Sequence, residues 1–382
     1  MTVLAAAKGS FVTSNERELQ SIAGLGFQPA AVVAWWGRLP TAGTKRGNRG
    51  GVGFWTANDS LSVSWASADG ESVTRTAHLG DHAALLGLDE VDAGIAMRAH
   101  IESLDHDGFT LRYATRPAQP WMVCFLALGG PAVSSARVGW TPPGSRPPSN
   151  RSKSVDRPGL VLLVPAPGES GIVGRGLAIG LGAKSSWGRA VAAGYLCPDG
   201  AEPGSATGSQ RSGTAFLDWP GDWAESNRFC YLQVQGLHAR IGTDVSPAGH
   251  GSRYTRVGFR PDALLLFSWG LRPSPMWNTM GRFCLGAASG NQCGCVSWDD
   301  RDGDPSETMT HVRSSTEHVL IVADSQSDNL HAQASLGSID DEGFTLDWLS
   351  DKPGREFAYV ALSGQDTRGL AARIVDRITR LR

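Results

Sequence analysis

The residues best suited to binding chemistry lie in the last third of the chain. The segment Asp299-Asp300-Arg301-Asp302-Gly303-Asp304 places carboxylates around a glycine, as the start of a calcium-binding loop does. With Gly303 at the sixth loop position, however, Trp298 and Met309 occupy the first and twelfth positions, where carboxylates are required. We therefore expect no bound metal and interpret the segment as the polar tip of a hairpin.

A loop aromatic beside hydrogen-bonding side chains is the second candidate. Sugars stack on exposed rings, while Asp, Asn and Arg bind their hydroxyl groups. Trp277-Asn278, with Arg272 nearby, has this composition. Together with the acidic segment it predicts a single ligand-binding surface. Its residues are Arg272, Trp277, Asn278, Asp300, Asp302 and Asp304.

The other aromatic residues divide by whether their positions recur along the chain. Recurring positions favour core packing, and they are held by Trp65, Tyr113, Trp219, Trp298 and Trp348. A second set is expected near strand ends or in loops, where rings are better placed to bind sugars: Trp36, Trp55, Trp121 and Trp223, together with Trp277.

The sequence contains none of the common catalytic motifs. It has no Gly-x-Ser-x-Gly or His-Glu-x-x-His, and its Gly-rich segment at 180–184 lacks the Gly-Lys-Ser/Thr ending of a P-loop. We predict no catalytic residues, no cofactor and no enzymatic activity. A polysaccharide-degrading enzyme stays open as an alternative, because the separation of paired carboxylates depends on the tertiary structure.

The cysteines predict buried thiols. Cys124 and Cys230 share one strand position, and the Cys293-x-Cys295 spacing lacks the second pair of a zinc site. A disulfide from Cys284 to Cys293 or Cys295 is the alternative if the protein is secreted or released.

The composition limits the class of protein. With 382 residues, 48 Gly, 21 Pro and 19% charged residues, the chain predicts many short strands joined by tight turns. A net charge of −2 offers no surface for nucleic acid. No apolar run is long enough for membrane insertion, and the N-terminus does not have the apolar stretch of a signal peptide. We expect synthesis in the host cytoplasm.

Internal repetition defines the architecture. Gly26-Phe27-Gln28-Pro29 opens one copy and Gly258-Phe259-Arg260-Pro261 another, and each copy ends about a hundred residues later in a Gly-Phe-Thr-Leu strand and an apolar closing strand. A fainter copy between them opens at Arg157-Pro158. An aromatic residue precedes an Asp-Gly pair by four positions in all three, which predicts a hairpin. The three segments Ala136-Arg137-Val138, Ala239-Arg240-Ile241 and Ala372-Arg373-Ile374 each follow a closing strand.

These copies predict three domains. Residues 1–139 form a first β-sandwich with an N-terminal extension, residues 140–242 a reduced middle sandwich, and residues 243–382 a third sandwich with a C-terminal tail. Each is expected to contain about six antiparallel strands in two sheets. The segments 141–157 and 243–256 are interpreted as polar connectors.

The ending of each copy resembles the C-terminal half of H-type lectin domains, which are six-stranded β-sandwiches that assemble as trimers and bind N-acetylgalactosamine-type sugars. The Gly-Phe-x-Pro opening resembles repeats of phage and prophage tail or spike proteins. The resemblance covers residues 26–130 and 258–364 well and the middle copy poorly. It implies an all-β fold of three tandem antiparallel β-sandwich repeats that form an intramolecular pseudo-trimer.

The expected function follows from this resemblance. It is that of a structural component of a phage or phage-like particle, such as a tail tip, fibre or head spike, located in the virion and active in host attachment. Its expected partners are other virion or particle proteins, with cell-surface polysaccharide as a candidate ligand. A free-standing lectin is the alternative.

Overall fold

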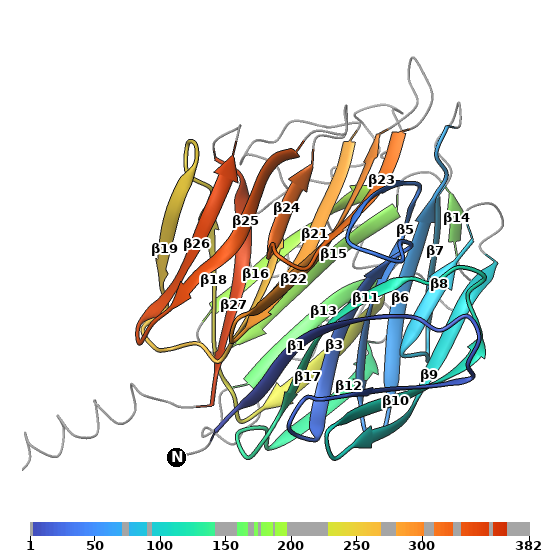
Figure 1. Cartoon of the computed structure of the whole chain (residues 1–382), viewed down its shortest axis with the longest axis horizontal. Coiled ribbons are helices and arrows are strands. Elements are labelled where there is room, and N and C mark those ends of the chain that lie inside the picture. The colour runs from blue at the N-terminus through green and yellow to red at the C-terminus, as the bar shows by residue number, and fades with distance from the viewer. Residues whose placement is uncertain are drawn as a thin grey trace, which may run out of the picture.

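The computed structural model describes residues 3–70, 76–89, 94–141, 159–166, 172–174, 177–185, 188–196, 228–268, 280–301, 309–323, 330–350 and 354–364. Every helix or strand element within these ranges is a β-strand, and all strand pairs are antiparallel, so the expected all-β fold is confirmed (Figure 1). No helix able to cross a membrane occurs in these ranges.

The first part of the chain forms two facing sheets. The larger has the order β1 (Ala5–Val12), β11 (Met122–Gly129), β3 (Pro29–Gly37), β5 (Asn48–Thr56), β6 (Ser60–Ser67), β7 (Thr76–Asp81) and β14 (Ile172–Gly174). The smaller has the order β2 (Leu19–Ala23), β10 (Gly108–Thr115), β9 (Ile95–Asp105) and β8 (Leu85–Leu88). Side chains of both sheets, such as Trp55 and Phe109, form one apolar cluster between them. This sandwich has more strands than the six expected.

The last part of the chain has the same arrangement. Its larger sheet has the order β18 (His238–Val245), β27 (Glu356–Ser363), β20 (Ala263–Ser268), β21 (Met280–Ser289), β22 (Gln292–Arg301), β23 (Met309–Ser315) and β4 (Gly43–Arg46). Its smaller sheet has the order β19 (Gly251–Arg256), β26 (Gly343–Ser350), β25 (Leu330–Ile339) and β24 (Leu320–Ala323). A second apolar cluster lies between these two sheets.

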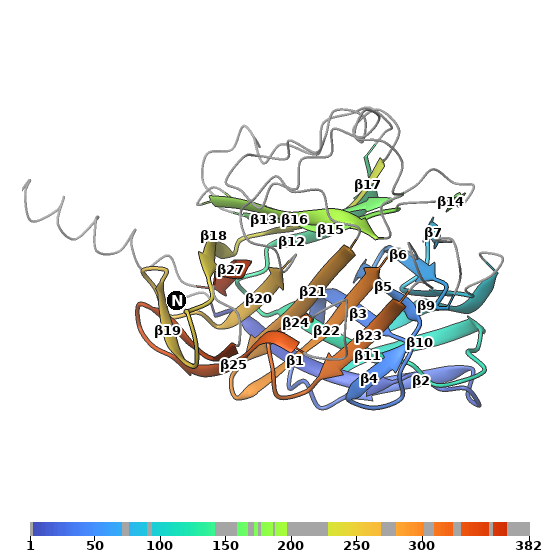
Figure 2. The ribbon, with the colours of Figure 1, turned by 90° about the horizontal axis from the view of Figure 1, so that it is seen from above.

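The middle of the chain contributes a single described sheet. Its order is β12 (Ser135–Trp140), β17 (Arg228–Gln235), β13 (Gly159–Ala166), β15 (Leu177–Ser185) and β16 (Gly188–Leu196). Figure 2 shows this sheet as a layer lying across the other two large sheets.

The three large sheets share one register between the opening and closing strands. Val32 of β3 pairs with Ala127, which is the fourth residue of the segment that begins at Cys124. Val161 of β13 pairs with Gln233, the fourth from Cys230, and Leu264 of β20 pairs with Ala361, the fourth from Ala358. The spacing that recurs in the sequence is therefore a spacing between hydrogen-bonded partners.

A central core lies between the three large sheets, because all three contribute side chains to one buried cluster. On β3, Val33 and Trp35 belong to this central core, whereas Val32 and Trp36 belong to the first sandwich. Successive side chains of a strand point to opposite faces, so a strand buried on both faces must be apolar throughout. This explains the uninterrupted run Val32-Val33-Ala34-Trp35-Trp36.

The segments Ala136-Arg137-Val138 and Ala239-Arg240-Ile241 do not end a sheet, as their place after a closing strand suggested, but begin the next one. Ala136-Arg137-Val138 lies in β12, which is hydrogen-bonded to β17, and Ala239-Arg240-Ile241 lies in β18, which is hydrogen-bonded to β27. Each segment therefore begins the sheet that follows it along the chain. The expected boundaries at 139/140 and 242/243 fall inside these strands.

The interpretation of the segment 243–256 as a connector needs correction, and the N-terminal extension of the first sandwich also contains strands. The N-terminal extension contains strands β1 and β2, and the expected connector 243–256 contains the end of β18 and the whole of β19. The strands of both segments are hydrogen-bonded to strands of the two sandwiches. Strands β1, β2, β18 and β19 lie at the edges of their sheets, where one side of each strand has no hydrogen-bonded neighbour among the described strands.

The expected hairpin at Asp69-Gly70 is confirmed, since β6 and β7 are antiparallel neighbours. Gly70 has a φ of 76°, a conformation that glycine adopts without strain. The connection runs from Ser67 to Thr76 and is longer than a two-residue turn.

Candidate functional site

The structure describes only one of the six residues assigned to a ligand from the sequence. Arg272, Trp277, Asn278, Asp302 and Asp304 lie outside the described residues, so their part in binding stays a prediction. Asp300 lies in β22 and is fully buried.

The interpretation of Asp299 and Asp300 as the start of an exposed hairpin tip was wrong. Both side chains have 0% of their surface exposed, because β22 extends to Arg301 and is paired on both sides, with β21 and with β23. A run of polar residues before an Asp-Gly turn signal does not reveal how far the strand continues, since partners for the charges come from other strands.

Asp299 is part of a buried ionic network with His311 and Arg313 of β23. The Oδ2 atom of Asp299 lies 3.1 Å from His311 Nδ1, and its Oδ1 atom accepts a hydrogen bond from Arg313 Nη1. All three side chains are at most 2% exposed. Carboxylate and guanidinium groups buried in this way stabilise a fold only while both partners are present.

The first sandwich has apolar residues at the corresponding positions. Asp299 pairs with His311 as Ala66 pairs with Ala77, and Arg313 stands where β7 has Leu79. Ala66 and Ala77 form a small apolar cluster with Leu88, against which Leu79 packs. Between the two described sandwiches, the Asp299 network occurs in the last one and not in the first, and its burial separates it from any solvent-borne substrate.

The junction with β4 lies beside this network. Asp69 Oδ1 accepts the Thr310 N–H at 2.9 Å, and Asp69 Oδ2 lies 3.0 Å from Arg46 Nε. The Gly47 N–H donates to the Thr310 carbonyl at 2.9 Å. These contacts join a strand of the N-terminal part to the edge of the last large sheet, so we assign this polar region a structural role.

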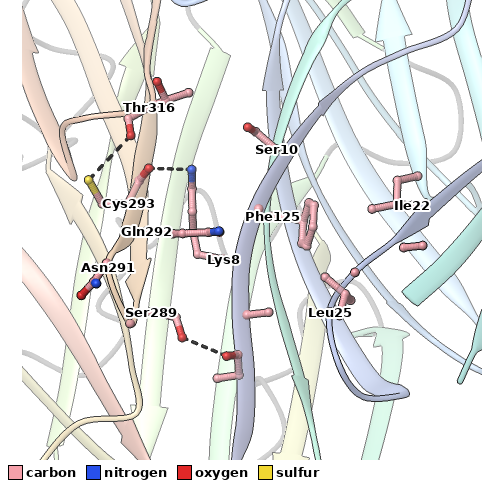
Figure 3. A pocket seen from close by; sticks show the side chains of 16 residues that line it. Lys8, Ser10, Ile22, Leu25, Phe125, Ser289, Asn291, Gln292, Cys293 and Thr316 are labelled. Carbon is pink, nitrogen blue, oxygen red and sulfur yellow. Dashed lines mark hydrogen bonds between the residues drawn. The ribbon is translucent and has the colours of Figure 1, made fainter. Parts of the chain in front are cut away.

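A cleft open to solvent lies at a different place, along β1 (Figure 3). Its volume is about 830 Å³, within the range of about 300–1,000 Å³ typical of small-molecule sites. One wall is formed by residues 289–293 around the turn between β21 and β22, and the other by residues 22–25 at the end of β2. We call this space the β1 cleft.

Lys8 is the only charged residue among those that line the β1 cleft. Its side chain is 5% exposed, and its Nζ donates to the Cys293 carbonyl at 2.6 Å (Figure 3). Among the described residues, no carboxylate lies within 4 Å of this ammonium group, so no ion pair offsets its burial. A buried ammonium group bound to one neutral carbonyl retains capacity for further acceptors.

Gly294 makes room for this ammonium group. A Cβ atom at residue 294 would lie 2.4 Å from Lys8 Nζ, which is closer than non-bonded atoms approach one another. The two residues are far apart in the sequence and meet only because β1 packs on β22.

The loop opposite the hairpin is held by a carboxylate. Asp107 accepts hydrogen bonds from the N–H groups of Gly26, at 2.5 Å, and Gly24, at 3.0 Å. These bonds, that of Gly26 first, lower the pKa of the Asp107 carboxyl below its ordinary value. Gly24 and Gly26 have φ values of 89° and 77°, so this wall has a shape that other residues adopt only with strain.

The described cysteines are free thiols, as expected from their spacing. Cys124, Cys230, Cys284 and Cys295 are buried, and Cys293 at the β1 cleft is half-buried. Burial raises the pKa of the Cys293 thiol above its ordinary value and raises that of Cys295 well above it. Both thiols are therefore protonated and weakly nucleophilic at neutral pH.

The aromatic residues differ from expectation in part. Trp65, Tyr113, Trp298 and Trp348 are buried, which confirms their assignment to the core. Trp36, Trp55 and Trp121 lie at or beside strand ends, as expected, but they are at most 2% exposed, so the expectation that their rings are available to sugars was wrong. All three pack in the core of the first sandwich, Trp36 from β3, Trp55 from β5 and Trp121 from the residue before β11. Trp219 and Trp223 lie outside the described residues.

Lys8 and the β1 cleft were not found from the sequence. A signal was present, because Ala6-Ala7-Lys8-Gly9, Ala136-Arg137-Val138-Gly139 and Ala239-Arg240-Ile241-Gly242 align on Ala and Gly. The third position holds Lys in the first segment and an aliphatic residue in the other two. Without the strand pairing, the first segment was taken as an extension.

Comparison with protein-family models, curated proteins and solved structures finds no match to this chain. Within the described ranges, no group of three or more His, Cys, Asp or Glu side chains is arranged to hold a metal ion.

Proposed function

We propose that the chain consists of three tandem β-sandwich repeats that form an intramolecular pseudo-trimer, the middle one reduced. The observation that supports this proposal is the cyclic packing of the first strands. β1 contacts β21 and β22, β12 contacts β5 and β6, and β18 contacts β15 and β16. Each first strand thus lies on the corresponding two strands of another sheet.

Hydrogen bonds at two of these junctions support the same arrangement. Ser289 Oγ donates to the Ala6 carbonyl at 2.9 Å, and Ser185 Oγ donates to the Ala239 carbonyl at 2.7 Å. Ser289 and Ser185 end β21 and β15, while Ala6 and Ala239 occupy the same register in β1 and β18. The junctions therefore share geometry as well as strand order.

The proposed function of this assembly is that of a structural and binding component of a phage or phage-like particle, such as a tail tip, fibre or head spike. The resemblance of the Gly-Phe-x-Pro openings to tail and spike repeats supports this class. A molecule whose three sheets share one core presents its loops on a rigid frame, which suits surface binding, with cell-surface polysaccharide as the proposed ligand. Other particle proteins are the proposed partners.

The experiment that tests this proposal is fractionation of the native source. An antibody against the chain should detect it in the particle fraction of a density gradient, in a fixed ratio to other particle proteins. A chain found only among free proteins, yet binding sugars when pure, would instead be a free-standing lectin. Release of reducing ends from host polysaccharide, abolished by removing one Asp or Glu, would indicate the enzyme alternative.

A further inference from the structure

We propose that the β1 cleft binds the carboxylate of an acidic sugar, such as a hexuronate, with Lys8 as the residue that receives the charge. The inference rests on the proposed glycan-binding function and names the substrate class and the site. The observation that supports it is the buried ammonium group of Lys8, which lies in the wall of a cleft open to solvent.

The position of Lys8 is apolar at the two related junctions. Gly9, Gly139 and Gly242 occupy the same register in β1, β12 and β18, pairing with Phe125, Tyr231 and Tyr359. The residue before each glycine is Lys8, Val138 or Ile241 respectively, and both aliphatic side chains belong to the central core. Strands β12 and β18 thus pack on their neighbours with an aliphatic residue here, so packing does not require the charge of Lys8.

The residue facing Lys8 differs in a complementary way. Gly294 pairs with Ala287 as Leu61 pairs with Phe54, so β6 has a leucine where β22 has Gly294. Leu61 and Val138 are both members of the central core. The β1 junction replaces this apolar combination by a lysine and a glycine, which leaves space for an ammonium group between the strands.

The electrostatics favour an anion in this space. Removing an ammonium group from water costs several kcal/mol unless an opposite charge or several acceptors replace the water. The Cys293 carbonyl supplies one acceptor at 2.6 Å. A ligand carboxylate at the remaining donors would form charge-assisted hydrogen bonds, which are about twice as strong as neutral ones.

The other polar groups of the cleft suit the hydroxyl groups of a sugar. Asn291 and Gln292 line it from the exposed β21–β22 turn. Their side-chain amides make no hydrogen bond to other residues in the described part of the chain, and Figure 3 shows Gln292 beside Lys8. Ser10 and Thr316 add hydroxyl groups on the same cleft.

Calorimetric titration of the full chain with sodium glucuronate, glucose and sodium acetate tests the assignment. We expect glucuronate to bind about tenfold more tightly than glucose or acetate, since it alone provides both the carboxylate and the hydroxyl groups. Lys8→Met should remove the preference for glucuronate over glucose. It should fold, because Val138 and Ile241 occupy the corresponding positions, and its thermal midpoint checks this.

Two further variants sharpen the result. Gly294→Ala keeps the charge but places a methyl group 2.4 Å from Lys8 Nζ, which must move, so glucuronate binding should weaken about tenfold. Its thermal midpoint is measured as well, because the same methyl group lies 2.9 Å from the Ser315 carbonyl oxygen. Lys45→Met removes a lysine of β4 that does not line the cleft and should leave binding unchanged.

The outcomes separate this inference from the proposed function. Absence of saturable glucuronate binding, or equal affinity in Lys8→Met, overturns the assignment of the cleft. Equal affinity for acetate and glucuronate overturns the saccharide part of it. If Lys8→Met and the native chain bind neutral glycans equally on an array while glucuronate does not bind, the cleft assignment fails and the proposed function stands.

Discussion

At the scale of single residues, the large sheets differ by polar side chains buried where a related strand is apolar. His78 pairs with Trp65 in the first sheet, whereas Val312 pairs with Trp298 in the last. Asp299 similarly stands where the first sheet has Ala66. For each of these polar residues, the corresponding position in the other sheet holds an apolar residue, which can be used as the control substitution.

The pH dependence of stability should include a contribution from His78. Burial lowers the pKa of its imidazole from 6.5 to about 3. The unfolded chain therefore binds a proton below about pH 6.5 that the folded chain does not bind until about pH 3, and stability falls as the pH falls through this window. Between pH 7 and pH 5 we expect the native chain to lose about 2 kcal/mol more than His78→Val.

Urea unfolding of both proteins at these two pH values measures the difference. The acidic groups titrate in both proteins and cancel in the comparison. An equal loss of stability in the two proteins would show that His78 is solvated or protonated in the folded state.

Removal of one partner from the Asp299 network should be strongly destabilising. Asp299→Ala leaves the Arg313 charge buried without its carboxylate, which typically costs about 3–5 kcal/mol. The triple variant Asp299→Ala, His311→Ala, Arg313→Leu copies the residues of the first sandwich. It should recover most of this loss, because replacement of a whole buried ionic group by apolar residues is often neutral.

The free energy of unfolding in urea distinguishes these cases. A triple variant as unstable as Asp299→Ala would show that the last sandwich cannot accommodate the apolar residues of the first. That result would show that the Asp299 network is needed for the packing of β22 and β23 in the last sandwich.

At the scale of elements, the first strands share a close contact between glycine and an aromatic ring. A Cβ atom at Gly242 would lie 2.5 Å from the Tyr359 hydroxyl, and one at Gly139 would lie 2.6 Å from the Tyr231 hydroxyl. At Gly9 the nearest atom is Cζ of Phe125, at 2.3 Å. The ring covers the glycine of the neighbouring strand, an arrangement that stabilises glycine in sheet edges.

Gly242→Ala should therefore weaken the pairing of β18 with β27. Overpacking of this kind typically costs about 1–3 kcal/mol. Gly249→Ala is the matched control, because no heavy atom lies within 4 Å of a Cβ atom built there. Thermal unfolding compares the two variants, and equal midpoints would contradict the proposed role of the contact.

At the scale of the whole molecule, the central core contains residues of all three large sheets. The sheets are therefore not the cores of separate, independently packed domains. Trp65 and Trp298 meet edge to face at 5.1 Å between ring centroids, although they belong to different sheets. Phe283 stacks on Trp298 at 5.7 Å. No single large sheet can cover its inner face without the other two.

Unfolding of the native chain should consequently be one cooperative transition. Trp298→Ala should lower the free energy of unfolding by roughly 3–5 kcal/mol and shift the whole transition without dividing it. Far-ultraviolet circular dichroism and tryptophan fluorescence should report the same midpoint in both proteins. Separate transitions would indicate that the sandwiches fold as independent units.

The sequence by itself determined the all-β class, the opening, late and closing strands, and their common spacing. These properties follow from local rules, since alternation and turn residues identify strands and a repeated spacing identifies equivalent ones. The recurrence of Trp65, Trp298 and Trp348 at fixed strand positions was sufficient to assign them to the core.

Only the tertiary structure decided which sheet each first strand joins and which charges are buried. β12 and β18 follow one closing strand in the sequence but are hydrogen-bonded to the next, and no local pattern specifies a distant edge. Lys8 reaches Cys293, and Asp299 meets Arg313 from a neighbouring strand. The free energy of burying a charge depends on such partners, which a linear pattern of polar and apolar residues does not contain.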